Sequence, residues 1–148
     1  MNQTEVSEKL HRLYDLNEMI KADCVRLNTI ANMRSPSFDN VGGSNMRNPL
    51  AESIVERNAM RTIEIEEEIE SMLKERDGLE AEAKDMFKCL SPKSKIVMEL
   101  RYLDGMSWME IASALFGMKK DFEDRKDSYR HVVTTRHGNA LTKIASCR

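Results

Sequence analysis

Apolar residues near the N-terminus recur with a seven-residue period. One heptad position is occupied by Val6, Leu13, Ile20 and Leu27, and its partner position by Leu10, Asn17, Cys24 and Ala31. Steps of three and four residues place both sets along one side of a helix, as in a coiled coil. The pattern predicts a helix over roughly residues 4–33. Asn17 lies in its seam, where a polar side chain lowers stability but fixes register.

A second seven-residue repeat follows between residues 50 and 87. Its two positions are filled by Val55, Thr62, Ile69, Arg76 and Ala83, and by Asn58, Ile65, Met72, Leu79 and Met86. Between the repeats, residues 34–49 are rich in the turn formers Ser, Pro and Gly. Neither helix can bury its apolar stripe alone, so residues 1–87 are expected to form an antiparallel helical hairpin with a loop at 34–49. Two arrangements stay open: the hairpin closes on itself, or it packs against a second copy as a homodimer.

Shorter helices with clear ends are expected from residue 91 onward. The pair Ser91-Pro92 starts the first, with the Ser91 hydroxyl accepting from a free backbone amide and Pro92 where no N–H is needed. Its apolar face comprises Ile96, Val97, Leu100 and Leu103. Asp104-Gly105 ends it, and Ser107 with Glu110 forms a capping box that starts the next helix. Gly117 is expected to end that helix in the left-handed conformation.

The last helix is expected to begin between Asp121 and Ser128 and to run to about Ala145. Its apolar face comprises Val133, His137, Leu141 and Ile144. The opposite face presents Arg130, His131, Thr134 and Thr135, with Arg136 at its edge. An apolar back with a short, polar and cationic front fits the major groove of DNA. The sequence therefore predicts an all-α protein, in which the hairpin of residues 1–87 precedes a C-terminal helix-turn-helix bundle at 88–148.

Composition agrees with a helical, soluble chain. Hydrophobic residues make up 41% of it and aromatic residues only 5%, and three prolines and six glycines leave room for long helices. The chain has no apolar run long enough to cross a membrane and no signal peptide, so we expect a cytoplasmic location. The three cysteines are odd in number and far apart in sequence, which favours free thiols in a reducing compartment.

Charge is distributed unevenly along the chain. Residues 1–87 carry 11 Lys and Arg against 18 Asp and Glu, whereas residues 88–148 carry 12 against 7. The net charge of −2 hides this contrast. An acidic front half with a basic back half is the asymmetry expected when only the C-terminal part meets phosphate.

The segment Arg101–Ala112, with the sequence RYLDGMSWMEIA, resembles the helix-turn-helix of small phage and prophage transcriptional regulators. These are similar to region 4 of bacterial sigma factors and include late-gene activators. The stretch His137–Leu141 also resembles the end of that family's recognition helix, so the likeness covers roughly residues 91–145. The chain departs from the family at Met118–Asp127, where the turn is too long. Either the recognition helix starts early or a loop is inserted.

The resemblance implies binding to double-stranded DNA in the bacterial host cell, at the nucleoid, with host RNA polymerase as a further partner. It implies that four residues face the base edges: Arg130, His131, Thr134 and Thr135. Candidates for phosphate contacts, which position a protein without specifying sequence, are Lys119, Lys120, Arg125, Lys126 and Arg136. Activation and repression both stay open.

Other functions have less support in the sequence. There is no glycine-rich phosphate loop or nucleophile elbow, and the three histidines are too scattered to chelate a metal, so no enzyme, metal or cofactor is expected. A small terminase subunit that marks DNA for packaging also combines a helix-turn-helix with helical oligomerisation segments, usually in the reverse order. A third interpretation makes the acidic coiled coil a protein-docking element without DNA binding.

Overall fold

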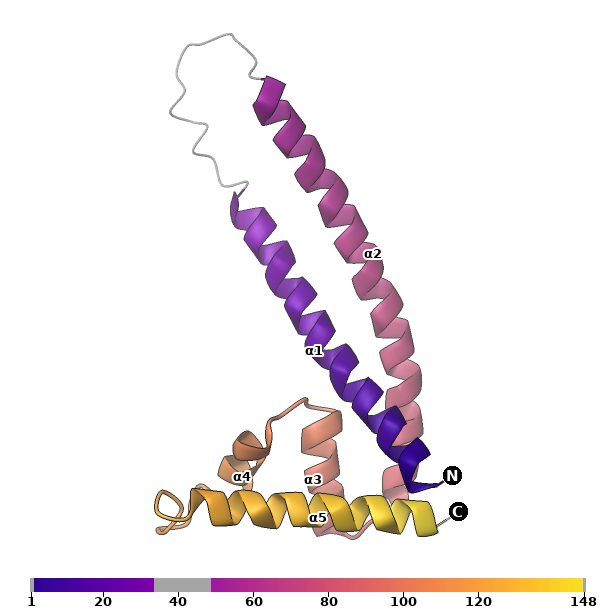
Figure 1. The fold of residues 1–148 in the computed structure, drawn as a ribbon, viewed down its shortest axis with the longest axis vertical. Coiled ribbons are helices and arrows are strands. Elements are labelled where there is room, and N and C mark those ends of the chain that lie inside the picture. Colours follow the sequence, from indigo (N-terminus) through magenta and orange to yellow (C-terminus); the bar gives the residue numbers. More distant parts are fainter. Residues whose placement is uncertain (1, 34–48, 148) are drawn as a thin grey trace. The chain divides into compact units, whose positions relative to one another are not determined.

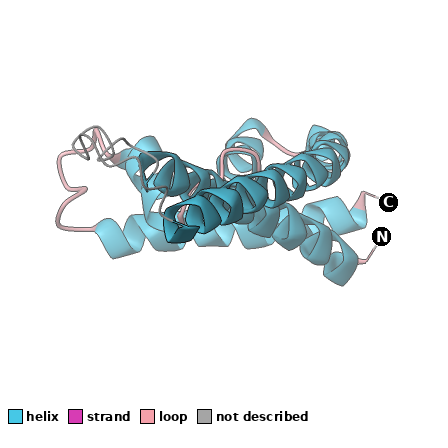
Figure 2. Cartoon of the chain, turned by 90° about the horizontal axis from the view of Figure 1, so that it is seen from above, coloured by secondary structure: helices cyan, strands magenta, loops and turns pink. Residues whose placement is uncertain are grey.

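The computed structural model describes residues 2–33 and 49–147, and within these ranges every regular element is a helix (Figure 2). The helices are α1 (Gln3–Met33), α2 (Pro49–Met86), the short 3-10 helix η2 (Phe87–Cys89), α3 (Pro92–Tyr102), α4 (Trp108–Phe116) and α5 (Lys126–Ser146). The all-α prediction is confirmed. The loop expected at 34–49 lies outside the described residues except for Pro49, which begins α2.

The chain forms two compact units. The larger, here called the terminal unit, comprises residues 1–18 and 75–148, and the central unit comprises residues 19–74. The terminal unit therefore extends across the boundary expected between residues 87 and 88, because the first turns of α1 and the last turns of α2 share its core. Among the described residues of the central unit, the buried apolar side chains are Ile20, Ile30 and Ile65.

Two hydrophobic clusters form the core of the terminal unit. The first joins α1 and α2 to the later helices and contains Val6, Leu10, Leu13, Ala83, Met86, Phe87, Met98, Tyr102, Ala140, Leu141 and Ile144. The second contains Val97, Ile111, Ala112, Phe122 and Val133. Helix α3 contributes to both, since the consecutive residues Val97 and Met98 enter different clusters. Helices α3 and α4 both pack on α5 (Figure 1).

The apolar face of α3 differs in part from the expected one. Val97, Met98 and Tyr102 are fully buried, whereas Ile96, which was assigned to this face, is 42% exposed. The prediction for Ile96 was therefore wrong. The buried face follows Tyr102, because a large aromatic ring removes more apolar surface from water than Ile96 would.

The seam predicted for α1 is correct in its first half and wrong further along. Val6, Leu10, Leu13 and Ile20 are buried. Cys24 and Ala31 are exposed, and their neighbours Asp23 and Ile30 are buried instead. Ile30 is much larger than Ala31, so its burial removes more apolar surface from water. The buried Asp23 carboxylate accepts a hydrogen bond from Arg26 at 3.1 Å.

Asn17 connects α1 to α3. Its side chain is buried, and its Nδ2 atom donates to the backbone carbonyl of Tyr102 at 3.0 Å. That carbonyl lies in the last turn of α3, where carbonyl oxygens have no partner within the helix. In the terminal unit, the ion pairs Lys9–Glu82 (2.7 Å) and Arg12–Glu75 (2.8 Å) show α1 and α2 running antiparallel.

The helix ends follow the predicted caps only in part. Ser107 caps α4 by accepting from the Glu110 amide at 3.2 Å, as predicted. Ser91 occupies the N-cap of α3, but its hydroxyl donates to the Ser94 hydroxyl at 3.3 Å and caps no amide, so that part of the prediction was wrong. Gly117 ends α4 with φ −60°, and the left-handed glycine is Gly105, with φ 68°.

Two alanine substitutions should therefore change stability in opposite directions. Gly105→Ala should destabilise the terminal unit by about 1–2 kcal/mol, because alanine is strained at a positive φ. Gly138→Ala should stabilise it by about 0.5–1 kcal/mol, because Gly138 lies within α5 and an added Cβ meets nothing within 4 Å. Urea unfolding, followed by the fluorescence of the single tryptophan Trp108, measures both changes in unfolding free energy. If both variants were stabilised or both destabilised, the backbone conformation assigned to one of these glycines would be wrong.

Asn17→Ala should destabilise the terminal unit by about 1–3 kcal/mol, since it leaves the Tyr102 carbonyl without its partner. Asn139→Ala is the matched control, because Asn139 is exposed within a helix of the same unit and gains the same helix propensity. The same fluorescence measurement applies. Similar unfolding free energies for the two variants would show that the buried hydrogen bond contributes nothing.

Candidate nucleic-acid interface

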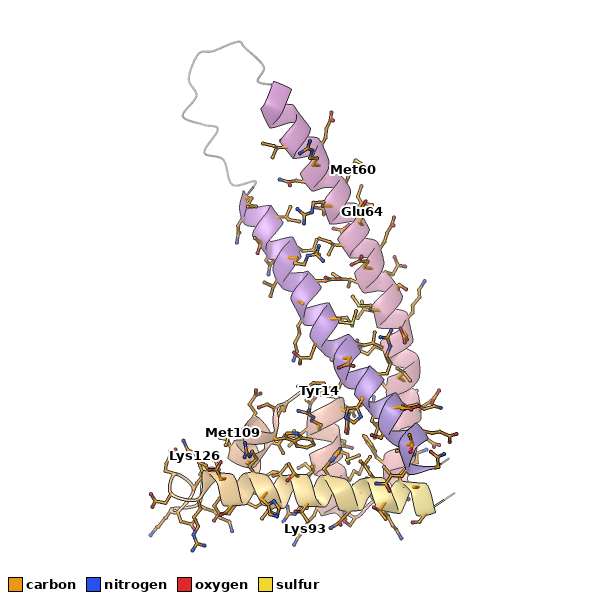
Figure 3. All side chains as sticks on the ribbon, viewed as in Figure 1. Tyr14, Met60, Glu64, Lys93, Met109 and Lys126 are labelled. Carbon is orange, nitrogen blue, oxygen red and sulfur yellow. The ribbon has the colours of Figure 1, made fainter. Side chains whose placement is uncertain are left out.

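The α4–turn–α5 segment is the part of the structure that corresponds to the predicted helix-turn-helix. Helix α5 begins at Lys126, labelled in Figure 3, which is within the predicted window from Asp121 to Ser128. Residues 117–125 form turns, so the long connection at 118–127 is a loop followed by the first residues of α5.

An aromatic stack holds this loop against α5. The Tyr129 ring stacks on Phe116 at 4.9 Å and on Phe122 at 5.9 Å between centroids. The Tyr129 hydroxyl donates to Asp121 Oδ1 at 2.7 Å, which lowers the pKa of the Asp121 carboxyl and raises the pKa of Tyr129. Phe122 is buried in the second core cluster. The loop is therefore anchored at Phe116, Asp121 and Phe122.

Helix α5 has a buried and an exposed face, as expected. Val133, Leu141 and Ile144 are buried, together with Ala140. On the other face His131 and Thr135 are exposed. Arg130 is also exposed, although it lies three residues before Val133 and seven before His137 and so shares their side of the helix. Thr134 is half-buried, and its hydroxyl donates to the His131 carbonyl at 3.0 Å. The four base-reading candidates thus lie within six residues of α5, but the Thr134 hydroxyl proton is already used inside the helix.

The cations near this face fall into two groups. Lys126 pairs with Glu123 at 2.7 Å, Arg125 with Asp121 at 3.9 Å and Arg130 with Asp127 at 3.8 Å. Within residues 2–33 and 49–147, Lys119, Lys120 and Arg136 form no ion pair. Residues 117–136 hold six cations and four carboxylates. The positive charge without an acidic partner is therefore concentrated in the second group.

Two cations of the second group lie near the aromatic stack. The Lys119 Nζ atom lies 5.7 Å from the Phe116 ring centroid and 5.8 Å from that of Tyr129. The Arg136 Cζ atom lies 5.4 Å from the Phe116 centroid. A ring face attracts a cation weakly at such distances and limits its freedom. The ring of Phe116 thus brings together charges from the loop and from the middle of α5.

Behind the exposed face, a polar and aromatic network joins four helices. The Tyr102 hydroxyl and His137 Nε2 share a hydrogen bond of 2.6 Å, and the Trp108 ring meets His137 edge-on at 4.7 Å. The Arg101 guanidinium lies over the rings of Tyr14 at 3.9 Å and Trp108 at 4.2 Å. Tyr14, on α1, is labelled in Figure 3. Sequence reasoning missed this network, although His137 on an apolar face pointed toward it.

Burial sets the protonation of this network. It lowers the pKa of His137 to about 4, helped by the positive charge of Arg101, and it raises the pKa of Tyr102 to about 12. Both side chains are therefore neutral at pH 7, and their hydrogen bond holds α3 to α5 without a buried charge.

Among the residues that the structure describes, no three His, Cys, Asp or Glu side chains are grouped to hold a metal ion. No helix in the same part of the chain is long and apolar enough to cross a membrane.

Comparisons with known proteins identify no relative: no protein-family model, no curated protein and no solved structure matches the chain.

The low pKa of His137 should make the terminal unit less stable as pH falls from about 6.5 to about 4. Over that range the unfolded chain takes up a proton at this residue while the folded ring stays neutral, so the contribution is complete above pH 6.5. In His137→Gln, the free energy of unfolding should fall by about 1–2 kcal/mol less between pH 6.5 and pH 4 than in the parent protein. This value is smaller than the full pKa shift would give, because the ring is partly exposed. Urea unfolding across this pH range measures the slope. Equal slopes in the parent protein and in His137→Gln would contradict the assignment.

Proposed function

We propose that the protein is a sequence-specific transcriptional regulator that binds double-stranded DNA by placing the first half of α5 in the major groove. The observation that carries this proposal is the two-sided character of α5. Its apolar face is buried, while His131 and Thr135 are exposed on the opposite side and Arg130 is exposed near the start of the helix. A helix fixed at the back with short polar side chains in front can present them to base edges.

Within this proposal, the exposed residues of α5 have different roles. Arg130 reads guanine through its two acceptors, because its ion pair with Asp127 is long and exposed and is exchanged at little cost. Thr135 meets a base edge or the thymine methyl group. Thr134 acts through its methyl group or as an acceptor, since its proton is bonded to the His131 carbonyl.

The phosphate contacts are assigned mainly to the unpaired cations. Among the described residues, Lys119, Lys120 and Arg136 form no ion pair, although Lys119 is near enough to Asp121 to help lower its pKa. Arg125 and Lys126, in contrast, pair with Asp121 and Glu123. Each phosphate neutralised releases counterions, so binding should weaken as salt rises.

The family resemblance over residues 91–145 supports a phage or prophage activator that works with host RNA polymerase in the bacterial cytoplasm. The acidic helices α1 and α2 then serve oligomerisation or docking on the polymerase. Glu64, labelled in Figure 3, belongs to an exposed acidic run on α2 together with Glu66, Glu67, Glu68 and Glu70. Such a run repels DNA, which assigns it to a protein partner.

Gel-shift binding to fragments from upstream of the neighbouring genes, over a salt series, tests the proposal. Arg130→Ala should weaken binding to the specific fragment by about 1–3 kcal/mol and relax sequence preference, because a bidentate base contact is lost. Lys93→Ala is the control, because it also removes one exposed cation, at the start of α3 (Figure 3). It should lower the affinity for DNA much less than Arg130→Ala does.

The outcomes separate the alternatives. Equal affinities for the two variants would remove Arg130 from the base-reading residues. Absence of a shift on every fragment would overturn DNA binding and favour the protein-docking interpretation. A specific shift confined to a packaging region, with none at promoters, would favour the terminase-like interpretation.

A further inference from the structure

Two cysteines that are far apart in the sequence line one cavity of the terminal unit. The cavity has a volume of about 270 Å³, and its lining consists of Asp85, Met86, Lys88, Cys89, Ile144 and Cys147. Cys89 ends the 3-10 helix η2, and Cys147 caps the C-terminus of α5, and these two helices pack together. Sequence spacing favours free thiols, because the fold and not the local chain brings these two cysteines together.

The two thiols have different environments. Cys89 is half-buried, and its Sγ atom lies 3.4 Å from the Met86 carbonyl, to which it donates. Burial, followed by the hydrogen bond and charge of the Cys147 thiol, raises the pKa of Cys89. Cys147 is exposed. The exposed thiol is therefore accessible to an oxidant in solution, and the inner thiol, whose pKa is raised, is the less reactive of the two.

We propose that Cys89 and Cys147 form a reversible intramolecular disulfide when a small-molecule disulfide such as oxidised glutathione is the oxidant. The Cys147 thiolate attacks one sulfur of the oxidant, so that a mixed disulfide forms and one glutathione thiolate leaves and is protonated. The Cys89 thiolate then attacks the Cys147 sulfur, which forms the protein disulfide and releases the second glutathione. The protein pair loses two electrons and two protons, and one oxidised glutathione becomes two reduced molecules.

The bond would connect the last turn of α5 to the α2–α3 junction. It would close the chain between residues 89 and 147, a loop that includes α3, α4 and α5. Closing a long loop restricts the unfolded chain and so stabilises the folded unit. The first half of α5 lies at the other end of that helix, so the residues proposed to read DNA stay free. The inference is thus independent of the proposed function.

The test uses the full chain with Cys24→Ser, which removes the exposed thiol of the central unit. After incubation with oxidised glutathione, free thiols are alkylated and the protein is digested with trypsin. We expect the linked peptides 89–93 and 144–148 in the mass spectrum, a monomer on a non-reducing gel and loss by reduction with dithiothreitol. The melting temperature should rise by about 5 °C or more on oxidation, as expected for a long closed loop in a unit of this size.

Two variants in the same background serve as controls. Cys89→Ser should leave Cys147 with one bound glutathione and no change in melting temperature, and Cys147→Ser should leave Cys89 largely free. If Cys147 in the parent protein carries glutathione while Cys89 remains open to alkylation, the proposal is overturned. Disulfide-linked dimers in place of the linked peptides would overturn it as well.

Discussion

The terminal unit depends on the two hydrogen bonds of Tyr102. Its backbone carbonyl receives the Asn17 amide from α1, and its hydroxyl shares a 2.6 Å hydrogen bond with His137 on α5. One residue therefore ties α1, α3 and α5 together, at the point where α3 ends and the turn to α4 begins. Because Tyr102 is only 1% exposed, loss of either partner would leave a polar atom without water to replace it. The orientation of α5, and with it the face proposed for DNA, follows from this arrangement.

Features that depend on the residues of one helix alone could be predicted from the sequence. The start of α4 at the Ser107 cap, the window for the start of α5 and the buried face of α5 all follow from local spacing. The prediction was wrong where contacts with other helices decide which of two candidate residues is buried. Ile30 is buried in place of Ala31, and Tyr102 determines the buried side of α3 in place of Ile96. Neither choice can be read from a repeat, because it depends on which side chain finds a partner across the core.

The candidate interface shows the same division. Arg125, Lys126 and Arg130 each pair with a carboxylate three or four residues away, a spacing that is visible in the sequence. Lys119 has Glu123 at the same spacing but forms no ion pair with it, so spacing alone does not separate the two groups of cations. The position of those two beside Phe116 is not visible, since the loop that carries Lys119 has no periodicity. The connection between α4 and α5 is longer than the turn expected from the family resemblance. It is held by the stack of Phe116, Tyr129 and Phe122.

The core of the terminal unit joins segments that are far apart in the sequence, which affects the order in which it can form during synthesis. Val6, Leu10 and Leu13 share one cluster with Leu141 and Ile144, which the ribosome adds only after the whole of residues 19–74. Until α5 emerges, the first turns of α1 have no complete surface on which to pack. Residues 19–74 lie between the two parts in the sequence, so a chain as long as this segment must be made before the terminal core can be completed.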